Sequence, residues 1–224
     1  MTTTKQMLTA GIAAAGLMAC AHTAEAGQIV GFSWSSGIAS IAGEPVDPPV
    51  DPNNDNFVGA SPNEIVVTQK DFFGVNGVAD IVFSVIDSGG TTEYLFTEGV
   101  SNSSGIDWDE YRIELGFGEG SGFIPSTPLD GLDFDAPDED SPRDFSVFFP
   151  SDVLDGEDVI VADGGIFPYL AFTTPPFVFS VDVPDGIDSF TIRQIPIAVP
   201  EPASASLIGL LGTGALIRRA RGRG

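Results

Sequence analysis

Apolar and polar residues alternate in many short runs of this chain, and Gly, Pro, Asp and Asn separate the runs. In residues 109–117, the odd positions from Tyr111 to Phe117 are apolar, whereas Arg112 and Glu114 between them are charged. Such alternation is typical of antiparallel strands that have one face in the core and one in water. No window keeps the period of about 3.6 residues that marks an amphipathic helix. The pattern therefore predicts an all-β domain.

Ten runs fit this strand pattern and are bounded by turn-forming residues. They are residues 28–34, 64–69, 80–86, 92–97, 109–117, 144–149, 157–162, 169–173, 177–183 and 189–195. So many short strands in about 170 residues favour an antiparallel two-sheet sandwich, with a jelly-roll-like arrangement as the preferred variant. We expect loops at 43–63 and 125–143, which are rich in Pro and Asp, and a short linker at 196–202.

Residues 1–26 have the pattern of a secretory signal peptide. One lysine precedes an apolar stretch rich in Ala and Gly, and the small residues Ala24 and Ala26 stand three and one positions before a cleavage site at Gly27. We expect a signal helix that is removed before Gly27. Two alternatives stay open: an N-terminal amphipathic helix, and a lipoprotein box in which Cys20 would carry the lipid.

The C-terminal residues 199–224 consist of three consecutive parts. Pro200, Glu201 and Pro202 are followed by the apolar segment 203–217 and then by four arginines, Arg218, Arg219, Arg221 and Arg223. A hydrophobic helix over 203–217 would be about 22 Å long, against a hydrocarbon core of roughly 30 Å. The arginines favour the cytoplasmic side and place the rest of the chain outside. We expect transient anchoring in the inner membrane, with an ordinary C-terminal anchor as the alternative. The predicted domains are a signal peptide (1–26), a β-sandwich (27–198) and the tail (199–224).

The segment between the two ends is strongly acidic. From Gly27 to Pro202 it holds 31 of the 32 acidic residues and four basic ones, a formal charge of −27. Such a surface repels phosphate backbones, so we expect no nucleic-acid partner. The only His (His22) and the only Cys (Cys20) precede the expected cleavage site. A mature chain would lack Ser-His-Asp or Cys-His catalysis, disulfides, and ordinary zinc or copper sites. We therefore expect a protein that is not an enzyme.

Oxygen-rich side chains gather in the second loop. The candidates for a Ca²⁺ site are Asp130, Asp133, Asp135, Asp138 and Asp140. Ca²⁺ takes about six to eight oxygen ligands and tolerates irregular geometry. The spacing does not match an EF-hand, because Asp135 stands where that loop needs glycine. A solvated loop without metal is the alternative, and we expect no resident cofactor besides this Ca²⁺ candidate.

The order of Pro200-Glu201-Pro202, an apolar helix and terminal arginines resembles the PEP-CTERM sorting signal. This resemblance implies recognition of the tail by an exosortase, a membrane-embedded transpeptidase-like enzyme, and cleavage near the Pro-Glu-Pro motif. With signal peptidase as the first processing enzyme, it implies display at the cell surface or in the extracellular matrix, in association with exopolysaccharide or biofilm. Residues 102–116 are also similar to a segment of exported β-sandwich proteins with interchangeable C-terminal anchors. Residues 190–194, which lead into the Pro-Glu-Pro motif, resemble the last strand of many PEP-CTERM proteins.

Two other functions stay open for the body of the chain. A secreted glycan-binding module could stack sugar rings on its aromatic side chains, namely Trp34, Trp108, Tyr94, Tyr111 and Tyr169. A glycosidase needs two carboxylates at a suitable separation, and 31 acidic residues make such a pair inevitable. Specific glycan binding or polysaccharide hydrolysis would distinguish these functions from a non-enzymatic surface protein.

Overall fold

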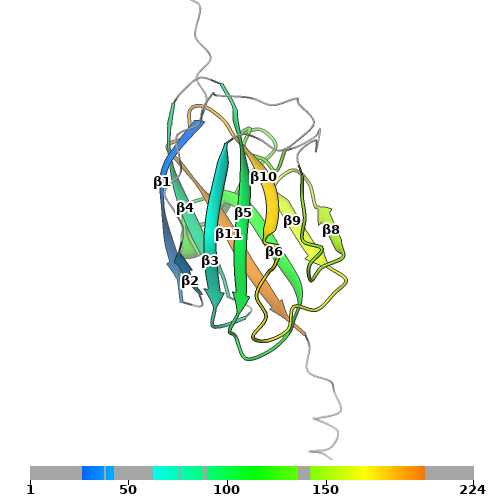
Figure 1. Cartoon of the computed structure of the whole chain (residues 1–224). Helices are drawn as coiled ribbons and strands as arrows, with labels where there is room; N and C mark the ends of the chain where they lie inside the picture. The colour runs from blue at the N-terminus through cyan, green and yellow to red at the C-terminus, as the bar shows by residue number, and fades with distance from the viewer. Residues whose placement is uncertain are drawn as a thin grey trace, which may run out of the picture.

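Two β-sheets pack face to face in a sandwich-like arrangement (Figure 1). The computed structural model describes residues 27–37, 39–42, 63–75, 77–87, 90–135 and 142–199. The all-β class and the two packed sheets predicted from the alternation pattern are confirmed.

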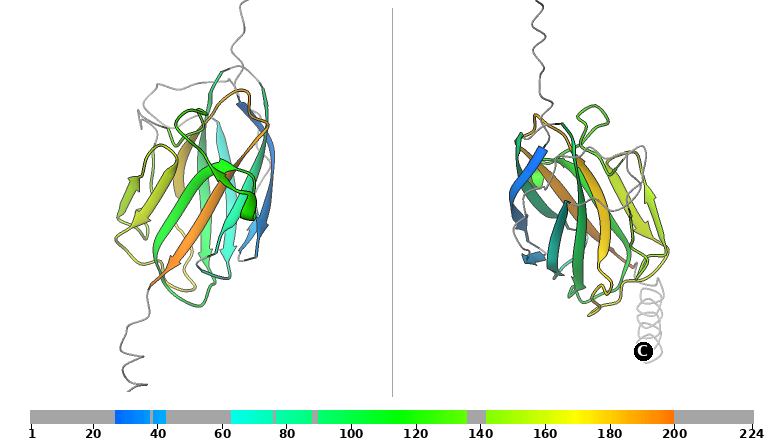
Figure 2. Two further views of the ribbon diagram at one scale, coloured as in Figure 1. Left: turned by 180° about the vertical axis from the view of Figure 1, so that it is seen from behind. Right: turned by 45° about the horizontal axis from the view of Figure 1, so that its top comes forward.

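The larger sheet has seven strands, and every neighbouring pair in it is antiparallel. Its order is β1 (Gly27–Ser36), β4 (Ala79–Asp87), β11 (Ser189–Ala198), β6 (Trp108–Phe117), β9 (Val159–Asp163) and β8 (Ser151–Leu154), and the short β7 (Ile124–Pro125) pairs with β6. The strand β11 therefore lies in the middle of this sheet, with hydrogen-bonded neighbours on both sides (Figure 2).

The smaller sheet is mixed, which corrects the prediction of a wholly antiparallel sandwich. Its order is β10 (Phe177–Val183), β5 (Thr92–Asn102), β3 (Glu64–Phe72) and β2 (Ala39–Ala42). The strands β3 and β5 run parallel. The reason is connectivity: β4, which lies between them in sequence, belongs to the other sheet, so the chain crosses the sandwich twice and returns in its original direction.

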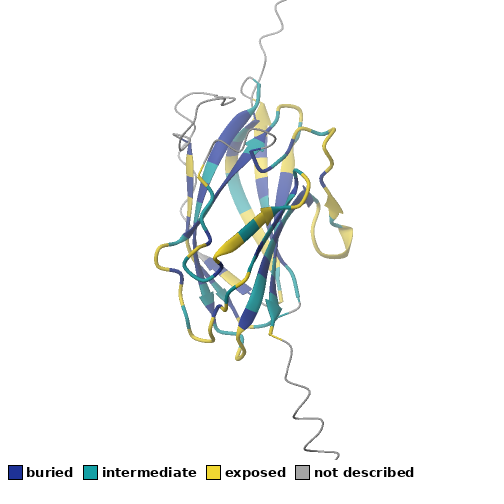
Figure 3. Cartoon of the chain, turned by 90° about the vertical axis from the view of Figure 1, so that its right-hand side faces the viewer, coloured by how far each residue is buried: buried dark blue, intermediate teal, exposed yellow. Residues whose placement is uncertain are grey.

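Side chains from the inner faces of both sheets form one core, which is rich in phenylalanine. Figure 3 marks the buried positions along the strands in dark blue. Phe83 of β4 meets Phe96 of β5 edge-on at 5.4 Å between ring centroids, and Phe96 stacks on Phe179 of β10 at 5.2 Å. All three side chains are fully buried. Burial of one such side chain contributes about 1.5–3 kcal/mol, so these aromatic contacts are a main source of the sandwich's cohesion.

Two of the predicted strands are wrong. Residues 144–149 form a turn, in which the backbone N–H groups of Phe148 and Phe149 both donate to the carbonyl of Phe145. The turn lets Phe145 and Phe149 both reach the core. Alternation in an extended strand would bury the same two residues, so the pattern could not distinguish the two structures. Residues 169–173 form a loop, because Leu170 has a positive φ of 66° that an extended strand does not allow.

The predicted linker at 196–202 also begins too early, because β11 continues to Ala198. Proline has no N–H group and is tolerated only where no neighbouring strand needs it. Pro196 meets this condition: β11 pairs with β4 only up to Gln194, so beyond that residue it has β6 alone as a partner. The strands β2 and β8, each four residues long, were missed by the pattern analysis.

The two predicted flanking helices lie outside the described residues. Within the described part of the chain, the helical structure consists of one 3-10 turn, Gly120–Gly122. None of the helices there has the length and apolar character needed to cross a membrane.

Candidate functional site

The predicted processing sites fall at the edges of the described chain. Ala24, Ala26, the Pro-Glu-Pro motif (Pro200, Glu201, Pro202) and the arginines Arg218, Arg219, Arg221 and Arg223 lie outside the described residues. Gly27 is the first residue of β1 and is buried. A Cβ atom on Gly27 would come within 2.6 Å of the Pro184 carbonyl oxygen, so only glycine fits there. The predicted cleavage point thus lies at the first residue of β1.

The described Ca²⁺ candidates have separate roles in local structure. The Asp130 carboxylate accepts hydrogen bonds from the Ser126 hydroxyl at 2.7 Å and from the backbone N–H groups of Thr127 and Leu132, which holds a turn. Asp133 forms a backbone bridge with Asp182, and Asp135 is buried with a positive φ of 51°. Asp138 and Asp140 lie outside the described residues. Among the described residues, no group of three or more acidic side chains could hold a metal ion.

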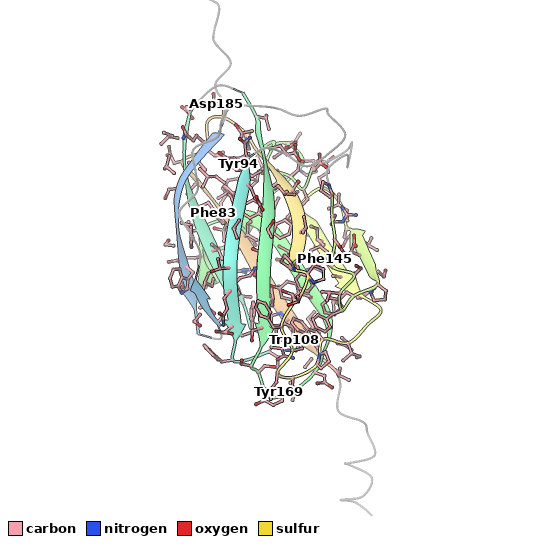
Figure 4. The ribbon with its side chains drawn as sticks, viewed as in Figure 1. Phe83, Tyr94, Trp108, Phe145, Tyr169 and Asp185 are labelled. Carbon is pink, nitrogen blue, oxygen red and sulfur yellow. The ribbon has the colours of Figure 1, made fainter. Side chains whose placement is uncertain are left out.

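The aromatic candidates for glycan stacking divide by burial. Trp108, Tyr94 and Tyr111 are fully buried in the core, where no sugar ring can reach them. Trp34 is 47% exposed and Tyr169 46% exposed. In Figure 4, Trp108 lies inside the sandwich, whereas Tyr169 lies at its lower end.

A buried polar cluster, which sequence reasoning missed, lies between the two sheets. It consists of Lys70 on β3, Glu98 on β5, Tyr111 on β6 and Gln194 on β11, and each of the four residues has 0% exposure. Each sheet contributes two members. Lysine and glutamate are almost never fully buried unless they are paired, so their presence at the centre of a core needs a reason.

A β-bulge places Lys70 in the core. On β3 the core-facing positions Ile65 and Val67 would be followed, in regular alternation, by Gln69. The pairing with β5 shifts register between Val67 and Lys70, because three residues on β3 span two on β5. Bulges of this kind re-aim side chains. Gln69 therefore faces outward, and Lys70 faces inward beside Phe72.

The cluster is closed by five hydrogen bonds between its own members. The Lys70 ammonium donates to Glu98 Oε2 and, at 2.5 Å, to Gln194 Oε1. The Tyr111 hydroxyl donates to the same Gln194 oxygen at 2.8 Å. The Gln194 amide nitrogen donates to both Glu98 oxygens, at 2.9 and 3.1 Å. The carboxamide thus turns its oxygen to two donors and its NH₂ group to a carboxylate, the orientation that satisfies every partner.

Burial changes the pKa of two side chains in the cluster. It lowers the pKa of the Lys70 amine from 10.5 to about 8, and the Glu98 carboxylate opposes only part of this shift. Burial also raises the pKa of Tyr111 well above 10.0, and the charge of Glu98 adds to the rise. The phenol therefore keeps its proton and remains a hydrogen-bond donor, while the amine loses its proton more readily than an exposed lysine does.

Aromatic rings surround Tyr111 on the core side. Its ring stacks on Trp108 at 6.0 Å and meets Phe72 edge-on at 5.9 Å. Trp108 follows the turn that connects β5 to β6, and its indole N–H donates to the Ser104 hydroxyl at 2.9 Å. In that turn, the Asn102 side chain donates to the carbonyls of Ile106 and Phe167. The segment 102–116, singled out for its resemblance to exported proteins, thus builds one wall of the cluster.

The signal that could have revealed the cluster is a polar residue at a core-facing strand position. Gln194 follows Phe190 and Ile192 on the inner face of β11, and Glu98 follows Tyr94 and Phe96 on that of β5. The predicted strand 92–97 ended one residue too early to include Glu98. Because the cluster has no exposed surface, it cannot bind a diffusing ligand.

Comparisons with protein-family models, with curated proteins and with solved structures found no match for this chain.

Proposed function

We propose that this chain is an exported, non-enzymatic protein of the cell surface or extracellular matrix, sorted by an exosortase-type enzyme and associated with exopolysaccharide or biofilm. The observation that carries the proposal is the order of elements at the C-terminus: the Pro-Glu-Pro motif, the apolar segment 203–217 and the four arginines. A short apolar segment capped by arginines would halt a translocating chain in the membrane, with the acidic domain already outside.

The domain's architecture supports this proposal. The Pro-Glu-Pro motif begins two residues after the last residue of β11, and the Val199 N–H donates to the Asp107 carbonyl at 3.0 Å. The motif therefore follows the folded domain with almost no spacer. The described chain starts at one end of the sandwich and leaves at the other (Figure 1). Such a placement lets the two processing steps occur at opposite ends of one compact body. We also propose to class the strand arrangement of the sandwich as jelly-roll-like.

Replacement of the tail's positive charges tests the proposal. We expect the variant with Arg218, Arg219, Arg221 and Arg223 changed to Glu, and a variant that lacks 203–224, to lose surface display and the mass change at the C-terminus. Cell fractionation and the intact mass of the protein measure both effects. A variant with Arg112→Glu, a charge change within the domain, is the matched control. Unchanged display and mass in both tail variants would contradict the proposal.

A secreted glycan-binding module is the second candidate, and the exposure of Trp34 beside Phe32 on β1 favours it. A glycan array with the purified protein distinguishes the two functions. Binding that Trp34→Ala abolishes and that Tyr169→Ala leaves unchanged would support the glycan-binding candidate. The same protein incubated with polysaccharides tests the carboxylate-based glycosidase, since release of reducing ends would show hydrolysis.

A further inference from the structure

The buried cluster brings together the groups that an amide exchange requires. Lys70 provides an amine, Gln194 provides a carboxamide, and the two side chains are in hydrogen-bond contact. The Glu98 carboxylate contacts both the amine nitrogen and the amide nitrogen, so it can carry a proton from one to the other. The Tyr111 hydroxyl donates to the Gln194 oxygen, where negative charge develops when an amine attacks the carbonyl carbon.

We propose that Lys70 and Gln194 form a covalent side-chain amide bond inside the folded domain, with Glu98 as the proton relay and Tyr111 as the donor to the oxyanion. Nothing besides these four side chains takes part. The bond would join β3 of the smaller sheet to β11 of the larger one.

The steps balance without an oxidant, reductant or cofactor. The Lys70 ammonium first passes a proton to the Glu98 carboxylate, which leaves a neutral amine and a neutral acid. The amine lone pair attacks the Gln194 carbonyl carbon, and the C=O electron pair moves to Oε1. Glu98 gives its proton to the amide nitrogen and then takes one from the attacking nitrogen. The original C–N bond then breaks, ammonia leaves, and the carbonyl re-forms in the new amide, with Glu98 left protonated.

The surroundings favour this reaction in the folded chain alone. A charged pair in a dry interior loses more hydration than its mutual attraction recovers, whereas a neutral amide and a neutral acid carry no such penalty. The folded strands hold the amine against the carboxamide, which turns a bimolecular step into an intramolecular one. In the unfolded chain the same residues are 124 positions apart.

Lys70 is also placed in the cluster by a specific feature of β3. It is the one lysine between Gly27 and Pro202, and a register shift in β3 turns it inward. Gln194 sits on the central strand that leads to the C-terminal tail. A bond at this point would link the strand that carries the tail to the opposite sheet.

Mass spectrometry of the full chain tests the proposal. We expect the denatured protein to be lighter by one ammonia than the sequence between its two actual ends. We also expect a digest to contain a branched peptide that joins Lys70 to Gln194. Trypsin should fail to cleave after Lys70, because it requires a free lysine side chain. The variants Lys70→Arg, Glu98→Gln and Gln194→Met should show no loss of ammonia, and Gln69→Ala, which changes the neighbouring outward-facing glutamine, should keep it.

The wild-type chain alone is sufficient to overturn the proposal. An unbranched chain at full sequence mass, cleaved by trypsin after Lys70, would do so whether or not the variants fold. A branched peptide that has lost water instead of ammonia would show a bond between Lys70 and Glu98 and would overturn the assignment to Gln194. The bond would form in any folded chain, wherever the chain is located. Absence of the bond would therefore leave the sorting proposal intact, and a mislocalised protein would leave the proposal of the Lys70–Gln194 bond intact.

Discussion

Burial determines what individual charged side chains do in this protein. Most carboxylates of the described residues lie at least partly in water, where they contribute solubility and little stability. Asp158 differs, because it is only 8% exposed and its Oδ1 atom accepts no hydrogen bond within the described residues. Burial raises its pKa above 3.8; a hydrogen bond with Ser126 opposes the rise, and the charges of Asp130 and Glu157 add to it.

Asp158 should therefore make the domain less stable as pH rises. Between 3.8 and the higher pKa of the folded state, the native chain binds more protons than the unfolded chain, so the free energy of unfolding falls with increasing pH. We expect Asp158→Asn to remove this fall and to raise the free energy of unfolding at pH 7. Urea denaturation from pH 4 to pH 7 measures the effect. Asp109→Asn, the same change on β6, is the control, and parallel pH profiles for Asp158→Asn and the wild type would contradict the prediction.

An ion pair with several hydrogen bonds joins β4 and β11. Arg193 of β11 donates to both carboxylate oxygens of Asp80 on β4, at 2.7 and 2.8 Å, and to the Gly120 carbonyl at 2.8 Å. Its guanidinium lies 3.9 Å from the centre of the Phe123 ring. The Asp80 side chain is 1% exposed, so this pair resists screening by solvent. The contact fixes the 3-10 turn against the sheet.

Removal of the Asp80 charge should leave the Arg193 cation without its main partner. Loss of one member of a buried pair costs about 3–5 kcal/mol, and the low end applies because the Arg193 side chain is 13% exposed. We therefore expect Asp80→Asn to lower the free energy of unfolding by about 3 kcal/mol in urea denaturation. Glu114→Gln breaks the more exposed Arg112–Glu114 pair and should change it by less than about 1 kcal/mol. Equal effects of the two substitutions would be inconsistent with this account.

At the scale of the whole molecule, the proposed bond would tie the two sheets together and close a loop of 124 residues. In the chain-entropy model, a cross-link over a loop of this order adds about 4–5 kcal/mol, because it restricts the unfolded chain. If the chain is displayed and held by its C-terminal tail, as we propose, such a link would resist unfolding by force, since the pulled strand β11 could not leave the core. It would also resist unfolding by proteases.

Gln194→Met, which removes the carboxamide and keeps the buried Lys70–Glu98 ion pair, should melt well below the wild type. At about 2–4 °C per kcal/mol for a domain of this size, we expect a decrease in Tm of roughly 10–20 °C. Scanning calorimetry measures it, and Gln69→Ala should melt close to the wild type. If Gln194→Met and the wild type had the same Tm, the cross-link would not be a source of stability.

Prediction from the sequence succeeded where side-chain alternation was regular. Tyr111, Ile113 and Leu115 are all buried as expected, and the inner face of 177–183 is in the core. It failed at 144–149, where a turn buries Phe145 and Phe149, and at Lys70, where a bulge reverses the alternation. The processing sites at both ends remain predictions, because they lie outside the described residues.

By itself, the sequence determined that the chain is a β protein with an acidic body and two distinct ends, because side chains on an extended backbone alternate between two faces whatever the strands pair with. Only the tertiary structure decided that β3 and β5 run parallel and that an amine, a carboxylate and a carboxamide meet in the core. Those outcomes depend on pairing register and on contacts between residues that are distant in sequence, 28 positions for Lys70 and Glu98 and 124 for Lys70 and Gln194, which no local pattern of polar and apolar residues contains.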